Sequence, residues 1–433
     1  MDKLLDVKEF DTIICNNDYK GDSSFKWLEE KQFKKLETFI HDFSGSEDSS
    51  DILDFMKISY RRGVGNTITI KNYVGLIQMN DGFQIQVLPK IDFDDSDDDR
   101  DVCTKKIFIK MLRSMKNFPS KVFNDAGLKI EKMNLYEIFI NMYLQEVRHL
   151  FKKGIKSFYI SQEDNLNYFK GKLMVSQHIK NNIAHKERFY VGYEEYHQNI
   201  PENKLIKSTL LKLQKITTSA ENSKEIKHLL IGFEMVDESI NFEKDFSRII
   251  FNRNTKDYEL LIEWAKVFLM NKSFSTFSGN TRSRALLFPM ESVFESYVAQ
   301  NMKKVFFEYG WTVSTQDRGH YLFNTPRNQF ALRPDIVISK DNRTIIMDTK
   351  WKRLVDNEGR NYGISQSDMY QMYAYAKKYN TSEIYLLYPL NNEMRNLTPI
   401  KFTSDDGVDV NVFFVDVVNI EISLKSLYVK LDE

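Results

Sequence analysis

The sequence predicts an α+β protein of several domains, and three patterns in its 433 residues predict that class. Apolar residues alternate as in strands over residues 57–92, recur at helical spacing over 103–280, and follow an order of helix, strands, helix and strand over 284–433. Hydrophobic residues make up 42% and charged residues 28%, which is typical of a globular chain with a sizeable core. At about 150 residues per domain, the length predicts about three domains.

The first 56 residues are predicted to form a helical N-terminal extension. Between residues 24 and 43, apolar residues recur at roughly helical spacing among Lys and Glu: Phe25, Leu28, Phe33, Leu36, Phe39, Ile40 and Phe43. The pattern then changes, because Phe83, Ile85 and Val87 alternate strictly with other residues after a hairpin signal, Asn80-Asp81-Gly82. Residues 57–92 are therefore predicted to form a small β-rich domain.

An acidic run over residues 92–99 marks the predicted boundary of this domain. Such a run repels itself and is typical of a solvated linker, whereas a divalent-cation loop would need a turn glycine that this run lacks. Residues 103–280 are predicted to form a mainly helical middle region. Its helices are expected over 107–115, 135–151, 205–213 and 258–268, with a short β-like insert near 158–174.

Charge and cysteine content exclude several classes of protein. Lysine plus arginine equals aspartate plus glutamate at 61 each, so any nucleic-acid affinity must come from a local patch or from a partner. The two cysteines, Cys15 and Cys103, are too few and too far apart for a disulfide framework or a zinc cluster. The N-terminus has no signal-peptide pattern and no apolar run could span a bilayer, so we expect a cytoplasmic protein with no membrane partner.

The C-terminal region, residues 284–433, is predicted to follow the order αβββαβ. A helix over 290–309 carries an apolar stripe at i, i+3, i+4 and i+7 spacing and ends at Gly310. Further elements are expected as strands over 311–316, 321–324, 332–339 and 344–351, a helix over 366–379 and a strand over 384–388.

Charged residues interrupt two of these apolar strands. Asp348 and Lys350 alternate onto the same face of strand 344–351, whereas Thr349 between them is expected to face away. Asp335 lies 13 positions before Asp348 (348 − 335), on the partner strand across a short turn, so hairpin pairing would bring the two carboxylates together. Neighbouring carboxylates repel each other, and an oxygen-preferring divalent cation resolves the conflict.

This arrangement, Pro334-Asp335 followed by Asp348-x-Lys350, resembles the signature of the PD-(D/E)XK nuclease superfamily. The resemblance implies hydrolysis of phosphodiester bonds, with Mg²⁺ held by Asp335 and Asp348 and with Lys350 near the attacking water or the transition state. An isolated Asp-x-Lys pair is more often a surface salt bridge. The apolar strands around this pair and the order of elements favour the nuclease.

Further residues match motifs of the superfamily. Gln371 and Tyr375, one turn apart on helix 366–379, resemble the Gln-x-x-x-Tyr motif that lines the active site of RecB-like nucleases. The alternative is two amphipathic residues on a wet helix face. Glu295 resembles the acidic residue that many members carry on the first helix, where it would join the metal ligands. Glu291 lies one turn away on the same flank, so either residue, or neither, would join the site.

Longer stretches resemble the McrC family, the nuclease subunits of McrBC-type modification-dependent restriction systems. They are residues 73–78, 85–91, 169–173, 178–179, 203–207, 333–336, 348–351 and 367–376. The resemblance implies a DNA endonuclease of antiviral defence that works with a separate AAA+ GTPase, a McrB-like hexameric ring that recognises modified DNA and translocates. It also implies that the chain docks on this ring through its N-terminal part, here residues 57–92, and stimulates GTP hydrolysis.

The sequence fits this division of labour, because it contains no GxxxxGK[ST] phosphate loop for a GTPase site of its own. Two other functions stay open: a stand-alone RecB-like nuclease of defence or repair, and an adaptor that keeps the fold but only activates its GTPase. Intact Asp335, Asp348 and Lys350 argue against the adaptor. The cluster Lys350, Lys352 and Arg353 either binds phosphates or forms a solvated basic turn.

Overall fold

A computed structural model of the chain describes residues 4–44, 55–79, 81–90, 100–115, 133–251, 255–270, 284–395 and 399–432. The chain divides into two compact units. The first combines Met1–Ser120, Lys129–Leu135 and Ser273–Glu433, and the second combines Lys121–Leu128 and Tyr136–Lys272. Mixed helices and sheets confirm the predicted α+β class with more than one domain. The acidic run over 92–99 lies outside the described residues.

The N-terminal part of the first unit contains two four-stranded sheets. Their strand orders are β1-β7-β6-β11 and β3-β2-β5-β4. The elements are β1 (Leu4–Lys8), β2 (Thr12–Ile14), a short 3₁₀ helix (Asn17–Tyr19), β3 (Lys26–Trp27), α1 (Glu30–Ser44), β4 (Met56–Arg61), β5 (Gly65–Ile70), β6 (Tyr73–Gln78), β7 (Gln84–Leu88) and β11 (Arg284–Pro289). The predicted strands around the Asp81-Gly82 turn are thus present as β6 and β7, an antiparallel pair.

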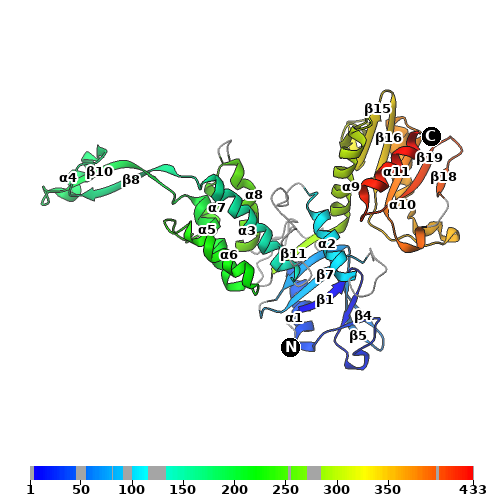
Figure 1. The fold of residues 1–433 in the computed structure, drawn as a ribbon, viewed down its shortest axis with the longest axis horizontal. Coiled ribbons are helices and arrows are strands. Elements are labelled where there is room, and N and C mark those ends of the chain that lie inside the picture. The colour runs from blue at the N-terminus through cyan, green and yellow to red at the C-terminus, as the bar shows by residue number, and fades with distance from the viewer. Residues whose placement is uncertain are drawn as a thin grey trace. The chain divides into compact units, whose positions relative to one another are not determined.

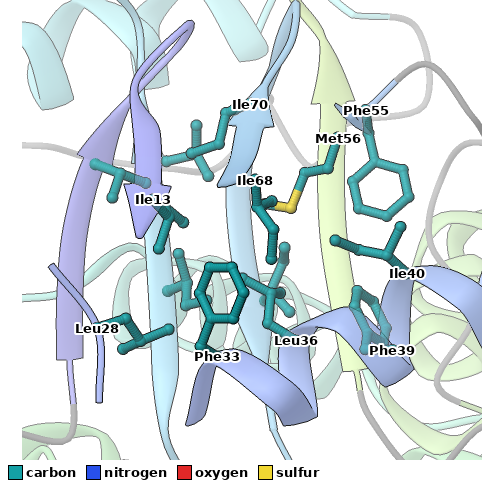
Figure 2. Close-up of a cluster of buried hydrophobic side chains, with 14 of the residues drawn as sticks. Ile13, Leu28, Phe33, Leu36, Phe39, Ile40, Phe55, Met56, Ile68 and Ile70 are labelled. Carbon is teal, nitrogen blue, oxygen red and sulfur yellow. The ribbon is translucent and has the colours of Figure 1, made fainter. Parts of the chain in front are cut away.

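The expectation of a helical extension over residues 1–56 is wrong, because these residues also supply three strands. The predicted helix exists as α1, and its Phe33 and Leu36 are buried against Ile13 and Ile68 of the sheets (Figure 2). β1, β2 and β3 have five, three and two residues, too few to show a periodic pattern in the sequence. The helix and the strands therefore share one hydrophobic core.

The C-terminal part of the first unit is built on a six-stranded sheet of order β12-β15-β16-β17-β19-β18. Its elements are α9 (Met290–Phe307), β12 (Thr312–Thr315), β13 (Tyr321–Phe323), β14 (Gln329–Ala331), β15 (Ile336–Lys340), β16 (Arg343–Thr349), a 3₁₀ turn (Glu358–Gly363), α10 (Gln366–Tyr379), β17 (Glu383–Pro389), a second 3₁₀ turn (Asn392–Met394), β18 (Lys401–Thr403), β19 (Asp409–Val415) and α11 (Ile420–Asp432). β12, β15 and β16 are antiparallel neighbours, and β16, β17 and β19 are parallel.

The predicted elements occur in the predicted order, and β14, β18, β19 and α11 are additional elements that the sequence pattern did not predict. The predicted strand over 321–324 is β13, which pairs with β14 in a separate two-stranded sheet rather than with the six-stranded one. α10 spans the predicted residues and buries Met372, Tyr375 and Ala376 against apolar side chains of the sheet. This packing fixes the helix over β16 and β17.

The second unit is a group of helices that carries a β-hairpin arm. Its elements are α3 (Leu135–Lys153), β8 (Phe158–Leu166), β9 (Lys172–Leu173), α4 (Val175–Asn182), β10 (Phe189–His197), α5 (Pro201–Ile216), α6 (Ala220–Ile231), α7 (Phe242–Arg248) and α8 (Lys256–Met270). Another helix, α2 (Arg100–Leu112), belongs to the first unit. Within the second unit, the hairpin arm (residues 158–197) extends away from the helices (Figure 1). The predicted helices over 135–151, 205–213 and 258–268 and the β insert are confirmed, and the insert reaches further, to His197. The predicted helix over 107–115 corresponds to α2, but its assignment to the middle region is wrong, because α2 belongs to the first unit.

Among the described helices, none combines the length and the apolar character that crossing a membrane requires. The described helices of the second unit instead bury their apolar residues against each other, with Tyr258, Trp264 and Phe268 of α8 among the most buried. Trp264 and Phe268 also contact each other, with ring centroids 5.6 Å apart. The apolar faces of these helices are thus accounted for by a protein core.

β11 joins the two parts of the first unit, because it pairs with β6 more than 200 positions earlier, from Arg284↔Gln78 to Pro289↔Tyr73. Gly75 makes the pairing possible. Its φ is +142°, and a Cβ at this position would lie 2.0 Å from the carbonyl oxygen of Leu286. No side chain fits in that space without moving the backbone of β11.

Replacing Gly75 by alanine should therefore lower the free energy of unfolding by at least about 3 kcal/mol, since both strands must separate to admit a methyl group. Gly65→Ala is the matched control: φ is +97° there, but nothing lies within 4 Å of a new Cβ. Only the backbone conformation is penalised at Gly65, by about 1 kcal/mol. Denaturant unfolding of both variants measures the difference, and equal losses would contradict the steric explanation.

Candidate active site

The two predicted carboxylates lie opposite each other where β15 and β16 meet. The antiparallel register pairs Ile336 with Met347, so the next step places Asp335 across from Asp348. Asp335 precedes β15, and its main-chain carbonyl accepts a hydrogen bond of 3.0 Å from the amide of Gln316. Asp348 lies within β16 and is only 1% exposed, because β17 covers the other side of its strand. The hairpin thus converges as the sequence predicted.

Thr349 holds the carboxylate of Asp335. Its amide and its hydroxyl both donate to Oδ2 of Asp335, at 2.8 and 2.6 Å. The expectation that Thr349 faces away from the site is therefore wrong. β16 ends at Thr349, so the strict alternation of side chains is not maintained past the end of the strand. The only feature of the sequence that pointed to this contact with Asp335 was the hydroxyl-bearing side chain of Thr349 directly after Asp348.

Lys350 connects Asp348 to helix α10. Its Nζ lies 2.6 Å from Oδ2 of Asp348 and 3.8 Å from Oδ1 of Asp368, and it donates to Oε1 of Gln371 at 3.1 Å. Gln371 in turn donates through Nε2 to the hydroxyl of Tyr375 at 2.7 Å. The predicted residues Asp348, Lys350, Gln371 and Tyr375 thus form one continuous network. Asp368 belongs to it as well and was not among the predicted site residues.

Burial controls the electrostatics of the carboxylates. It raises the pKa of Asp348 to about 7, and the charge of Asp335 adds to the shift. Burial also raises the pKa of Asp335, although the two hydrogen bonds from Thr349 and the charge of Lys350 oppose the rise. Burial lowers the pKa of Lys350, but the charge and hydrogen bond of Asp348 together with the charges of Asp368 and Asp335 outweigh this effect, and the net direction is upward. Lys350 therefore stays protonated beside its carboxylate.

Of the two glutamates on α9, Glu295 is the one close to Asp335. Burial raises the pKa of Glu295 to about 7, and the negative charge of Asp335 contributes. Its Oε1 accepts a hydrogen bond of 3.0 Å from Gln316. Glu291 instead accepts a hydrogen bond of 3.1 Å from the side-chain amide of Asn72. Glu295 therefore lies beside the carboxylate pair, whereas Glu291 is hydrogen-bonded to Asn72 in the N-terminal part of the first unit.

The donor set suits a small hard cation. In the described part of the chain, no three His, Cys, Asp or Glu side chains form a ready ligand cluster. Mg²⁺ does not require one, because it is usually bound by one or two carboxylates together with water and substrate phosphates. Oδ2 of Asp348 is buried and forms an ion pair with the ammonium of Lys350 at 2.6 Å. A carboxylate oxygen of this kind is a natural ligand for a cation.

A cavity of about 510 Å³ in the first unit adjoins this network. Lys350 and Asp368 line it together with the following residues: Glu9, Phe10, Asn72, Lys90, Glu291, Trp351, Lys352 and Arg353. Glu9, which is 0% exposed, connects the N-terminal sheets to the strand end. Its carboxylate accepts from the indole Nε1 of Trp351 at 3.1 and 3.3 Å and from the amide of Lys90 at 3.2 Å.

The buried Glu9 should make stability depend on pH. Burial raises its pKa from 4.5 to about 7, although the hydrogen bond from Trp351 opposes the rise. A carboxyl group whose folded pKa exceeds its unfolded value stabilises the fold most when protonated, so its contribution is lost as pH rises from about 4.5 to the folded pKa of about 7. Glu9→Gln should flatten this decline, by up to about 3 kcal/mol across the interval. Denaturant unfolding of the parent chain and of Glu9→Gln at several pH values measures the free energy of unfolding. Parallel curves of this free energy against pH would contradict the assigned role of Glu9.

Comparisons with known proteins identify the family. A family model described as a McrBC 5-methylcytosine restriction system component matches residues 68–389. The chain is similar to a solved chain of the half-complex from a tetradecameric assembly of Thermococcus gammatolerans McrB AAA+ hexamers with bound McrC. The identity is 18%, the TM-score is 0.68, and the match covers 98% of this chain and 100% of that chain.

A chain of the Thermococcus gammatolerans McrBC complex, solved by cryo-electron microscopy, also matches. The identity is 21%, the TM-score is 0.48, and the match covers 68% of this chain and 85% of that chain. No curated protein matches the sequence. Because the family model covers well over half of the sequence, the resemblance noted in the residues is confirmed: the chain belongs to the family of McrBC 5-methylcytosine restriction system components.

Proposed function

We propose that this chain is the Mg²⁺-dependent DNA endonuclease subunit of an McrBC-like restriction complex in the cytoplasm. One observation carries the proposal: Asp335, Asp348 and Lys350 converge at the ends of two adjacent strands, although burying these charges is unfavourable. The free-energy cost of burying these charges is not explained by the stability of the fold. The order α9, β12, β15, β16, α10, β17 around them supports a PD-(D/E)XK nuclease domain.

In this function, Asp335 and Asp348 would hold the cation. When bound, Mg²⁺ would supply Lewis-acid polarisation of the scissile phosphate and acidification of a water molecule. Thr349 keeps Oδ2 of Asp335 in place through two hydrogen bonds. Lys350 presents a positive charge to the developing negative charge of the transition state, and Gln371, supported by Tyr375, orients the ammonium group. Glu295 would act as a further ligand next to Asp335.

The proposed partner is a McrB-like hexameric AAA+ GTPase whose GTP hydrolysis this chain stimulates. The similar solved chain comes from an assembly of McrB AAA+ hexamers with bound McrC, and this chain carries no phosphate loop of its own. Recognition of the modified DNA is then the task of the partner. A stand-alone nuclease would cut DNA without nucleotide or partner, and a non-cleaving adaptor would stimulate GTP hydrolysis without cutting.

Asp348→Asn, which keeps the size of the side chain but removes its charge, should lower DNA cleavage by at least about a thousandfold. Stimulation of the partner's GTPase should be unchanged, because Asp348 lies inside the nuclease sheet. Asp341→Asn is the control: this exposed residue in the β15–β16 turn has φ +52°, a conformation that asparagine tolerates. Plasmid cleavage with Mg²⁺, GTP and the partner measures both variants. Undiminished cutting by Asp348→Asn contradicts the proposed catalytic role.

The docking surface for the partner has two candidates. The family resemblance points to residues 57–92. The structure favours the hairpin arm as well, because Tyr159 and Tyr196 lie opposite each other on β8 and β10, 69% and 62% exposed. Their ring centroids are 5.0 Å apart. Exposed apolar side chains of this kind, concentrated on one projecting element, are typical of protein interfaces.

A double variant, Tyr159→Ser with Tyr196→Ser, should lower the apparent affinity for the partner by about tenfold, because aromatic anchors carry much of the binding energy of interfaces. Tyr60→Ser is the matched variant, since Tyr60 lies on β4 within residues 57–92 and is 74% exposed. GTPase stimulation as a function of chain concentration measures both. If only the Tyr60 variant lost affinity for the partner, docking would be assigned to the N-terminal sheets and the hairpin arm would be excluded.

A further inference from the structure

The wall of the cavity that faces Lys350 is built by the N-terminal sheets. Phe10 follows β1 and Lys90 follows β7, and the parallel pairing of these strands, which ends at Lys8↔Leu88, brings the two residues together. The amide of Glu9 donates to the carbonyl of Leu88 at 3.0 Å. The ammonium of Lys90 lies 5.6 Å from the centre of the Phe10 ring. This pair is therefore fixed by backbone contacts rather than by flexible loops.

Phe10 adopts a backbone conformation that side chains normally avoid. Its φ is +66°, and its amide donates to the carbonyl of Ile70 at 3.1 Å. The large apolar side chain of Phe10 lines the cavity and is 46% exposed. Glycine would be the ordinary residue at this φ. Strain of this kind, combined with exposure of an aromatic ring, is typical of functional positions.

The cations that line the cavity could bind a phosphate chain. They are Lys90, Lys350, Lys352 and Arg353, and they outnumber the acids of the lining, Glu9, Glu291 and Asp368. Arg353 pairs with Glu393 at 2.6 Å and Lys350 with Asp348, whereas Lys90 forms no salt bridge within 4.0 Å among the described residues. The acid closest to Lys90 is Glu9, and burial raises its pKa to about 7, so part of its population is neutral near physiological pH. An ammonium group is thus available beside the proposed catalytic lysine.

We infer that the N-terminal sheets supply part of the DNA-binding surface, with Lys90 binding a backbone phosphate and Phe10 stacking on an unpaired base next to the scissile bond. The inference rests on the proposed nuclease function and extends it. Aromatic rings beside cations are the combination that binds single-stranded nucleic acid, because every base has a face on which a ring can stack. The strand bound at the nuclease site would then be locally unpaired.

The two contacts have different signatures in binding measurements. We would titrate a labelled single-stranded oligonucleotide with the full chain carrying Asp348→Asn, at several salt concentrations. Lys90→Gln should weaken binding and lower the slope of log affinity against log salt by about one, whereas Lys90→Arg should retain both. Phe10→Gly should weaken binding by about tenfold without changing the slope. Lys57→Gln, an exposed lysine of β4 outside the cavity, is the control for net charge.

Phe10→Gly also separates binding from folding. Glycine tolerates φ +66°, so the thermal midpoint should stay the same or rise while DNA affinity falls. A fall in both the thermal midpoint and the DNA affinity would make Phe10 a structural residue.

Excess GTP should not displace the oligonucleotide. Displacement would show that the cavity surface around Phe10 and Lys90 binds a nucleotide instead. A smaller effect of Phe10→Gly on single-stranded than on double-stranded DNA would contradict base stacking.

Different experimental results would overturn this inference and the nuclease proposal. If the chain cleaves DNA in an Asp348-dependent manner but Lys90→Gln and Phe10→Gly bind like the parent, only the role of the N-terminal wall is overturned. A parent chain that does not bind the oligonucleotide overturns it too. If no Mg²⁺-dependent cleavage occurs with the partner and GTP, the nuclease proposal itself is overturned.

Discussion

The buried carboxylate pair at the end of the β15–β16 hairpin is the constraint on which the rest of the first unit depends. Two carboxylates in an apolar sheet repel each other and lose their hydration, and each loss is unfavourable by several kcal/mol unless it is compensated. The chain compensates locally, with two hydrogen bonds from Thr349 to Asp335 and the ammonium of Lys350 at Asp348. α10 must then lie where Gln371 reaches Lys350, and its buried Met372 and Ala376 hold it there.

The same constraint reaches the N-terminal sheets. Trp351 follows directly after Lys350, and its indole donates to Glu9, a residue 342 positions earlier in the chain. β11 pairs with β6, and Met290 at the start of α9 donates to the carbonyl of Asn72 at 3.0 Å. Within the first unit, the N-terminal sheets and the end of β16 are therefore joined by hydrogen bonds and strand pairing.

Local patterns in the sequence predicted most of the C-terminal part, because β16 and α10 carry strong periodicity and the site residues lie on them. Asp348 and Lys350 lie together as their spacing indicated, and Gln371 and Tyr375 join them as the resemblance to RecB-like nucleases implied. The N-terminal part was predicted less well. Strands of two to five residues such as β1 and β3 contain too few side chains for a pattern, and their pairing partners lie far along the chain.

Thr349 and Glu9 illustrate two further limits of prediction from sequence. Thr349 was assigned to the opposite face because alternation was continued to the last residue of β16, where its amide and hydroxyl instead reach Asp335. Glu9 gives no local signal at all, since an acidic residue at the end of a short strand normally faces water. Only the pairing of β1 with β7 and the approach of Trp351 make it a buried hydrogen-bond acceptor.

Two unusual residues of the N-terminal sheets line the cavity beside Lys350. Phe10 has an unfavourable φ, and Glu9 is a buried acid. Each feature lowers stability, and none is needed to form the sheets, because α1 and the strands already share a core of well-packed apolar residues. Unfavourable features that gather at one cavity, when the fold could do without them, are more economically explained by ligand binding than by packing. The lining of the cavity, with residues from the N-terminal sheets and from the end of β16, therefore supports the proposed ligand-binding role.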